Sequence, residues 1–193
     1  MKKGLIAFII IVIIVGGFGC SKYNGLVKED TQSQTAWANV QSAYQRRADL
    51  IPNLVNTVKG EANFEKSTLE NVIQARASAT QVKVDPTNLT PEKLKEFQDA
   101  QGQLSQALGR LLVVTENYPT LRANDAFRGL QAQLEGTENR INVARNDYNT
   151  SVQSYNTAVR TFPGNIIAGI SGFKAKAPFE ADAAAQKAPE VKF

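Results

Sequence analysis

The chain has 193 residues, 42% hydrophobic and 21% charged, a balance that suits one globular domain with additional segments. It has no histidine and a single cysteine, Cys20, which excludes imidazole-ligated zinc sites, Ser-His-Asp or Cys-His nucleophiles and internal disulfides. Setting aside Lys2 and Lys3 leaves 20 of the 22 basic residues against 18 acidic ones, with no basic cluster of the kind that binds nucleic acid. We therefore expect no metal, no cofactor and no nucleic-acid partner.

Residues 1–22 predict a membrane anchor. Lys2 and Lys3 precede an uncharged run of 18 residues, 4–21, at the lower limit for a membrane-spanning helix. Because basic residues favour the cytoplasmic side, the chain after Lys22 is expected on the extracytoplasmic side, periplasmic or extracellular. The alternative is a lipoprotein signal peptide that ends at Cys20, which would then be lipidated. The bulky aromatic residue two positions before this cysteine fits such a cleavage site poorly, so an uncleaved, single-pass anchor is favoured.

A long helix is predicted from Asn24 to about Lys59. Four large apolar residues recur seven positions apart, as in the seam of a helix bundle: Trp37, Tyr44, Ile51 and Val58. Pro52 lies inside this helix, where a proline removes one backbone hydrogen bond at a cost of roughly 3 kcal/mol. A compensating contact is therefore expected, and Asn53 is the predicted cap for the freed backbone.

The polar residues around Pro52 form a candidate interaction patch: Arg46, Arg47, Asp49 and Asn53. One interpretation is a contact surface for a partner. The other is an ion network inside the bundle, which is favoured because paired charges set helix register, whereas an unpaired buried charge costs about 3–5 kcal/mol. An enzyme that uses the arginines on an anionic substrate is disfavoured, since no nucleophile or base accompanies them.

Three more helices are predicted: residues 62–80, a third from Pro91 to Pro119 with Thr90 as its cap, and a fourth opened by Asn124. The fourth carries the most regular pattern in the chain, a column of large residues seven apart: Phe127, Leu134, Ile141, Tyr148, Tyr155 and Phe162. Short connections favour antiparallel neighbours. The sequence thus predicts an all-α protein, an antiparallel up-down four-helix bundle with long helices over residues 23–162.

Residues 163–193 are predicted to form an apolar strap and a mobile tail. The fourth helix should return towards the membrane, which places near the bilayer a set of apolar residues: Ile166, Ile167, Ile170 and Phe173. Four glycines and prolines between Pro163 and Gly172 argue against a stable helix here. The segment is expected either to strap the open end of the bundle or to form a short hydrophobic plug, with Lys174 and Lys176 able to meet anionic headgroups.

The assembled chain resembles the LemA family of bacterial membrane-anchored helical proteins. Three stretches carry most of the resemblance: Ala36-Trp37-Ala38-Asn39-Val40, Arg46-Arg47-Ala48-Asp49-Leu50-Ile51-Pro52-Asn53-Leu54-Val55 and Phe162-Pro163-x-Asn165-Ile166-Ile167-Ala168. The segment Tyr23-Asn24-x-Leu26-Val27 and the residues Phe173 and Phe179 add to it. The resemblance implies a single amino-terminal anchor and a four-helix bundle, and it implies no particular biochemical activity.

Two functional hypotheses follow. In the first, the chain is a membrane-tethered, non-enzymatic module that binds or scaffolds another envelope protein. Four polar residues at seam positions would loosen its core enough to admit a partner helix: Gln101, Thr115, Thr137 and Ser151. In the second, it is a membrane-interacting or lipid-sensing protein that acts through its anchor and its apolar C-terminal segment together.

Overall fold

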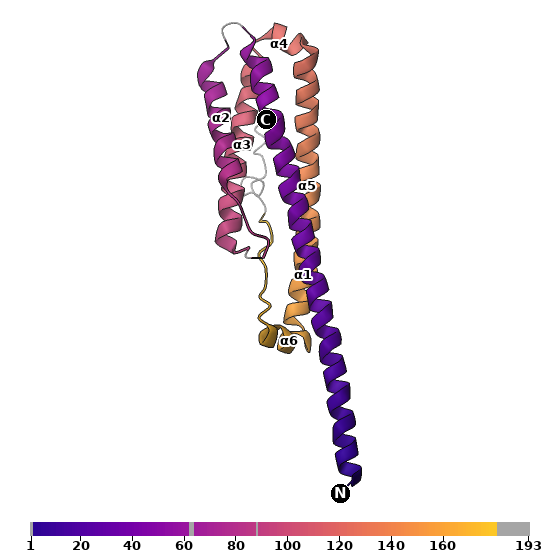
Figure 1. The fold of residues 1–193 in the computed structure, drawn as a ribbon. Helices are drawn as coiled ribbons and strands as arrows, with labels where there is room; N and C mark the ends of the chain where they lie inside the picture. The colour runs from indigo at the N-terminus through magenta and orange to yellow at the C-terminus, as the bar shows by residue number, and fades with distance from the viewer. Residues whose placement is uncertain (1, 62–63, 88, 181–193) are drawn as a thin grey trace, which may run out of the picture.

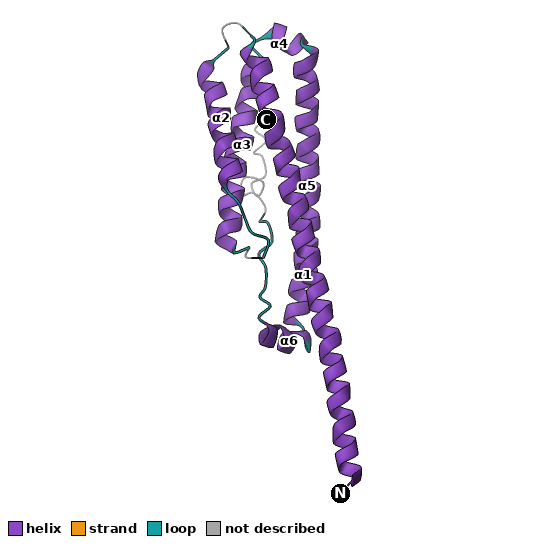
Figure 2. Cartoon of the chain, in the orientation of Figure 1, coloured by secondary structure: helices purple, strands orange, loops and turns teal. Residues whose placement is uncertain are grey.

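The computed structural model describes residues 2–61, 64–87 and 89–180. All regular structure in these residues is helical (Figure 2), which confirms the prediction of an all-α protein. The helices are α1 (Lys2–Lys59), α2 (Lys66–Gln81), α3 (Pro91–Thr115), α4 (Pro119–Ala123), α5 (Asp125–Arg160) and α6 (Gly164–Ser171). The predicted tail after Pro178 lies mostly outside the described residues, which end at Glu180.

The anchor segment and the first helix of the body form one continuous helix, α1, of 58 residues and about 87 Å. The helix predicted to begin at Asn24 therefore starts far upstream. Most of the apolar part of α1, residues 4–21, projects beyond the other helices (Figure 1), and the large side chains described there are exposed. Among the described residues this is the one helix long and apolar enough to cross a membrane.

The body is built on two pairs of helices, α1 with α5 and α2 with α3, which lie side by side (Figure 1). The connection between α1 and α2 and the short helix α4, between α3 and α5, lie at the end away from the N-terminus. We call this the distal end. At the opposite, proximal end α1 leaves the body, and α6 packs against both α1 and α5.

Local signals set the helix starts. The Thr90 hydroxyl accepts a hydrogen bond from the backbone N–H of Lys93, and Pro91 occupies the first turn, as predicted for α3. Hydrogen bonds from its own backbone N–H and from Thr90 lower the pKa of Glu92. Asn124 caps α5 in the same way, accepting from the backbone N–H groups of Ala126 and Phe127. Both predicted starts are confirmed.

The core divides into two clusters along the body. The distal cluster is mainly aliphatic and includes Ile51, Leu54, Val58, Leu104, Leu111 and Phe127. The proximal cluster is richer in aromatic side chains and includes Trp37, Tyr44, Phe97, Ile141, Tyr148 and Phe179. The seven-residue columns predicted on α1 and on α5 as far as Tyr155 are buried. Phe162 is not: it is 79% exposed, because α5 ends at Arg160 and the chain turns away from the core.

The expectation that glycine and proline prevent a helix after Pro163 is wrong, because α6 forms there. A Cβ at Gly164 would lie 2.3 Å from the carbonyl oxygen of Ala158, so glycine is required where α6 meets the end of α5. Gly172 has φ 77°, the left-handed conformation that glycine adopts readily at the C-terminus of a helix. Phe173 N–H then donates to the carbonyl of Ala168. The glycines position and end α6.

Candidate functional site

The predicted patch on α1 does not form a single surface. Arg46, Asp49 and Asn53 are exposed, and the carboxylate of Asp49 accepts a hydrogen bond from Gln45 on the same helix. Arg47 points the other way and is 3% exposed. The structure therefore leaves three of the four residues at the surface and puts the fourth inside the body.

Arg47 connects α1 to α3 and α5. Its Nη1 donates to Ser105 Oγ at 2.8 Å and to Glu138 Oε2 at 3.0 Å, and its Nη2 donates to Gln101 Oε1 at 2.9 Å. The buried Gln101 in turn donates from Nε2 to the carbonyl of Ala79 on α2, at 3.2 Å. One charged residue thus links all four long helices at the level between the two hydrophobic clusters. This arrangement fits the interpretation of Arg47 as part of an internal ion network.

The contact that compensates for Pro52 comes from α2. A proline at position 52 leaves the carbonyl of Ala48, four residues earlier, without its helical N–H donor. Arg76 Nε donates to this carbonyl at 2.8 Å. Asn53 makes no such cap: its side chain is exposed, and its own carbonyl accepts from Thr57 Oγ1. Sequence reasoning missed Arg76, for which the only signal is a cationic residue among small side chains.

The other polar seam residues are satisfied within their own helices. Thr115, Thr137 and Ser151 are buried, and each hydroxyl donates to the carbonyl three residues earlier. They therefore need no partner from a facing helix, and their small volume allows close helix packing.

At the proximal end an extended strap, residues 173–180, runs back along α5. Two asparagines of α5 hold it by pairing with its backbone. Asn156 accepts from the N–H of Lys176 and donates to its carbonyl, both at 2.8 Å. Asn149 does the same with Phe179, at 2.8 and 3.2 Å. Each amide thus satisfies both backbone groups of one strap residue, as a neighbouring strand would.

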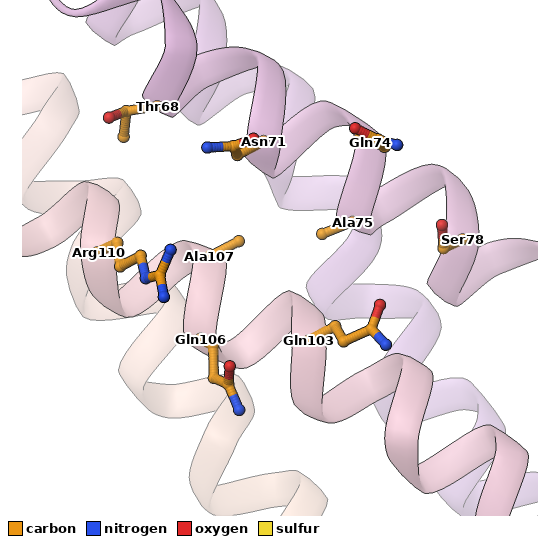
Figure 3. A pocket seen from close by; sticks show the side chains of 9 residues that line it. All are labelled: Thr68, Asn71, Gln74, Ala75, Ser78, Gln103, Gln106, Ala107 and Arg110. Carbon is orange, nitrogen blue, oxygen red and sulfur yellow. The ribbon is translucent and has the colours of Figure 1, made fainter.

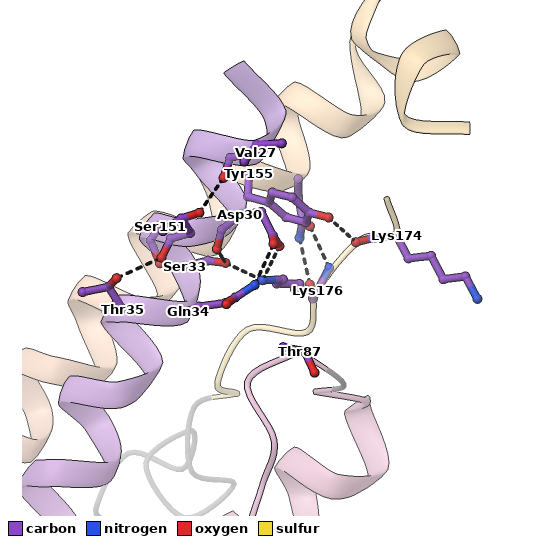
Figure 4. Close-up of polar contacts among 12 residues, drawn as sticks. Val27, Asp30, Ser33, Gln34, Thr35, Thr87, Ser151, Tyr155, Lys174 and Lys176 are labelled. Atoms are coloured by element: carbon purple, nitrogen blue, oxygen red, sulfur yellow. Dashed lines mark hydrogen bonds and ion pairs between the residues drawn. The ribbon is translucent and has the colours of Figure 1, made fainter. Parts of the chain in front are cut away.

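Two tyrosines of α5 complete the backbone contacts. Tyr155 donates its hydroxyl to the carbonyl of Lys174 at 2.9 Å (Figure 4), and Tyr148 donates to Ala177 at 3.0 Å. Burial raises the pKa of Tyr148; burial, and secondarily the charge of Asp30, raise the pKa of Tyr155 to about 12. Both phenols therefore stay protonated donors at neutral pH.

The repeat of α5 matches the strap geometrically. The tyrosine–asparagine pairs recur seven residues apart, about 10.5 Å along a helix, while their strap partners recur three residues apart, about 10 Å in an extended chain. The signal in the sequence is the repeated Tyr-Asn-Thr at 148–150 and 155–157.

Side chains seal the strap onto the body. Phe179 is buried and stacks on Trp37, with ring centroids 5.7 Å apart. Lys176 forms an ion pair with Asp30 on α1 at 2.7 Å and donates to Ser33 Oγ (Figure 4). These contacts attach the strap both to the proximal cluster and to α1.

The predicted membrane-proximal residues divide by face. Ile167 and Phe173 face α1: Ile167 Cδ1 lies 3.9 Å from where a Cβ on Gly19 would be, and the Phe173 ring centroid lies 5.9 Å from that of Tyr23. Ile166 and Ile170 face outward and are 51% and 80% exposed. α6 therefore lies beside α1 where its apolar part ends, one residue from the exposed Cys20.

A shallow groove of about 260 Å³ lies between α2 and α3 (Figure 3). It is lined by uncharged polar and small residues together with Arg110: Thr68, Asn71, Gln74, Ala75, Ser78, Gln103, Gln106 and Ala107. No hydrogen bond within the described part of the chain uses its four amide side chains. The lining contains no carboxylate, and among the described residues no group of three or more Cys, Asp or Glu could hold a metal ion.

Comparison with known proteins gives the same family that the sequence resembles. A model of the LemA family matches residues 36–193. Magnetosome proteins MamQ 1 and MamQ 2 of Paramagnetospirillum magneticum are each 28% identical over 176 residues, which cover 82% of this chain and 65% of each relative. Protein LemA of Metamycoplasma hominis is 27% identical over 118 residues, covering 61% of this chain and 50% of that protein. The match spans less than two thirds of each of these relatives.

Proposed function

The chain belongs to the LemA family, and from that premise we propose that it is a membrane-tethered, non-enzymatic helical module of the bacterial envelope that binds or scaffolds another envelope protein. Residues 1–22 are its anchor, and residues 23–162 form an antiparallel up-down four-helix bundle of α1, α2, α3 and α5. Lys2 and Lys3, before the apolar segment, support an extracytoplasmic location for the bundle.

The observation that carries the proposal is the continuity of α1. The helix runs without a break from exposed apolar residues into the packed body. A tether of this kind transmits the orientation of the membrane segment to the body, whereas a flexible linker would not. The module is therefore suited to present a surface at a defined position above a membrane.

A non-enzymatic role is supported by the chemistry of the described residues. Arg47, the buried cationic residue of the predicted patch, is engaged by three side chains of the body. The groove between α2 and α3 offers amides and hydroxyls but no acid or base pair. The names of the family and of its matched relatives are not those of enzymes.

The groove between α2 and α3 is the surface we assign to the partner protein. Its free amides can pair with a peptide backbone or with polar side chains, as Asn149 and Asn156 pair with the strap. Polar, uncharged contact of this kind gives directional hydrogen bonds without requiring a large apolar interface.

Site-specific photocrosslinking in native membranes tests this assignment. A photoreactive residue at Gln103, in the groove, is expected to yield a discrete protein adduct by mass spectrometry. A probe at Asn139, an exposed amide on α5, is the matched control and should yield none. The adduct should disappear in a Gln106→Ala variant of unchanged helix content. Equal adducts from both positions, or none from Gln103, would remove the groove from the proposal. A second probe at Arg46 reports on the exposed remainder of the predicted patch.

A further inference from the structure

The outer face of α6 has the reverse of the polarity expected for a helix in water. Its inner side presents the buried small residues Gly164 and Ala168 to the body and the half-buried Ile167 to α1. Its outer face carries Ile166 and Ile170, and Phe162 continues the same four-residue spacing before the helix begins. A helix of a soluble domain buries its large apolar residues and exposes polar ones. Here the three large side chains are 51–80% exposed.

This apolar face lies beside the segment assigned to the membrane. Ile167 of α6 touches α1 at Gly19, and Phe173 meets Tyr23 one turn later. Beyond this level α1 continues alone (Figure 1), and the large apolar side chains described there, Phe18 among them, are exposed. The outer face of α6 therefore lies at the level of α1 where the exposed apolar surface of α1 begins. By contrast, the exposed large apolar residues of the rest of the described body are isolated: Ile73, Val113 and Val143.

The charge around α6 has one sign. Residues 1–28 and 148–179, which include α6 and the parts of α1 and α5 beside it, contain no aspartate or glutamate. They contain exposed Lys22, Arg160 and Lys174. The first acidic residue of α1 to face the strap, Asp30, is already paired with Lys176. A surface that combines exposed apolar side chains with a rim of cations is complementary to anionic headgroups over acyl chains.

We propose that α6 is a second membrane contact, in which Phe162, Ile166 and Ile170 insert into the headgroup region of the leaflet from which α1 emerges, with a preference for anionic lipid. An interfacial helix of this type lies about 5–10 Å deep. The inference rests on the proposed membrane tether and adds a partner to it, a lipid surface. With two membrane contacts, α1 and α6, the body is held at a fixed angle to the membrane, whereas α1 alone would let it tilt. The distal end then stands about 56 Å from the membrane, the length of α1 from Lys22 to Lys59.

Fluorescence quenching of the full chain in vesicles tests the proposal. Ile170→Cys, in a Cys20→Ser background, is labelled with an environment-sensitive dye and reconstituted into vesicles of phosphatidylglycerol and phosphatidylcholine. Lipids with a quencher attached near the headgroup should extinguish most of the dye fluorescence. Val113→Cys, an exposed apolar position on α3, is the matched control and should be quenched severalfold less.

Flotation of the same vesicles separates this proposal from the tether on which it rests. Chain that fails to float with the vesicles would overturn the tether. Chain that floats, while the dye at position 170 is quenched no more than the dye at 113, would overturn the membrane contact of α6 and leave the tether standing. If the helix content of the Ile170→Cys variant shows that it is misfolded, the dye is attached at Ile166→Cys and the measurement is repeated.

The preference for anionic lipid has its own readout. Lys22→Gln with Lys174→Gln should reduce quenching at position 170 in vesicles that contain phosphatidylglycerol, and should leave it unchanged in vesicles of phosphatidylcholine alone. Equal quenching of the parent chain in both lipids would overturn the electrostatic part of the proposal.

Discussion

The two ends of the α1–α5 pair are completed in different ways. Towards the distal end the pair packs with α2 and α3, and the core is built from aliphatic side chains of helices. Towards the proximal end the strap is added beside the start of α3, and Phe179 packs in a cluster of aromatic rings that includes Phe97 of α3. The same two helices therefore support a helical neighbour at one end and an extended neighbour at the other.

The difference follows from where backbone hydrogen bonds are made. A helix satisfies its own N–H and carbonyl groups, so a helical neighbour needs only apolar side chains opposite it. An extended strap brings unsatisfied groups, so α5 must provide partners. It does so with Asn149 and Asn156. It also does so with tyrosines, which occupy positions of the seven-residue column that earlier in α5 are held by Leu134 and Ile141. The change from aliphatic to hydroxylated residues along one helix column marks where its neighbour changes.

Arg47 lies between the two ends, and its removal should lower the free energy of unfolding more than any other change considered. Arg47→Ala leaves the buried amide oxygen of Gln101 without its donor and removes the link to Glu138. We expect a loss of about 3 kcal/mol in the free energy of unfolding, measured by urea denaturation in detergent. Arg46→Ala, one residue away but exposed, is the control and should stay within about 0.5 kcal/mol. Equal losses in the two variants would contradict the structural role of Arg47.

Phe179→Ala should loosen the proximal end alone. Truncation of a buried phenylalanine typically costs about 3–5 kcal/mol, but a strap can detach locally, so we expect about 2 kcal/mol. Hydrogen exchange at the N–H groups of Lys176 and position 179 should accelerate, while exchange in α2 and α3 stays unchanged. Phe162→Ala, an exposed phenylalanine nearby, is the control. Faster exchange throughout the body would show that the two ends unfold as one unit.

A double-mutant cycle between Pro52 and Arg76 isolates the contact that α2 makes with α1 beside the proline. In the parent chain, Arg76→Ala leaves the carbonyl of Ala48 without a donor. Pro52→Ala restores a backbone N–H four residues after that carbonyl, so the same Arg76→Ala change should then cost less. We expect a coupling free energy of about 1 kcal/mol from urea denaturation. Additive effects would mean that Arg76 does not compensate for the proline.

The smallest expected change in stability occurs only in alkaline solution and involves Tyr155. Burial, and secondarily Asp30, raise the pKa of Tyr155 to about 12 from an ordinary value of 10.0. Because the folded state favours the protonated phenol, its contribution to stability is complete below pH 10 and is lost as the pH rises from 10 to about 12. The urea midpoint should fall over this range, and less so in Tyr155→Phe. An unchanged decline in the variant would assign the pH dependence to other groups.

Much of the fold was predictable because it follows from local geometry. Trp37, Tyr44, Ile51 and Val58 are buried as their seven-residue spacing predicts, and Thr90 and Asn124 cap helices as their positions predict. The burial of Arg47 agrees with the internal position favoured for it, since apolar residues, Val40 and Leu54, lie seven residues to either side.

Other features were not predictable from local pattern. Phe162 continues a perfect column yet is exposed, because α5 ends two residues earlier. Glycine near Pro163 suggests a break in a helix. In the structure a Cβ at Gly164 would clash with the carbonyl oxygen of Ala158, so the position requires glycine. The candidate patch on α1 divides because residues 46 and 47 differ by about 100° around the helix, so a helix that buries Arg47 leaves Arg46 exposed.

The sequence by itself determined the all-α class, the apolar segment before the body, the starts of α3 and α5 and most of the buried faces, since helix periodicity and capping act over a few residues. The tertiary structure alone decided three contacts: Arg76 with the carbonyl of Ala48, the strap with Asn149 and Asn156, and α6 with Gly19 of α1. Each pairs groups 20 or more residues apart in the chain. Such a pairing depends on where whole helices come to lie, and no local preference encodes it.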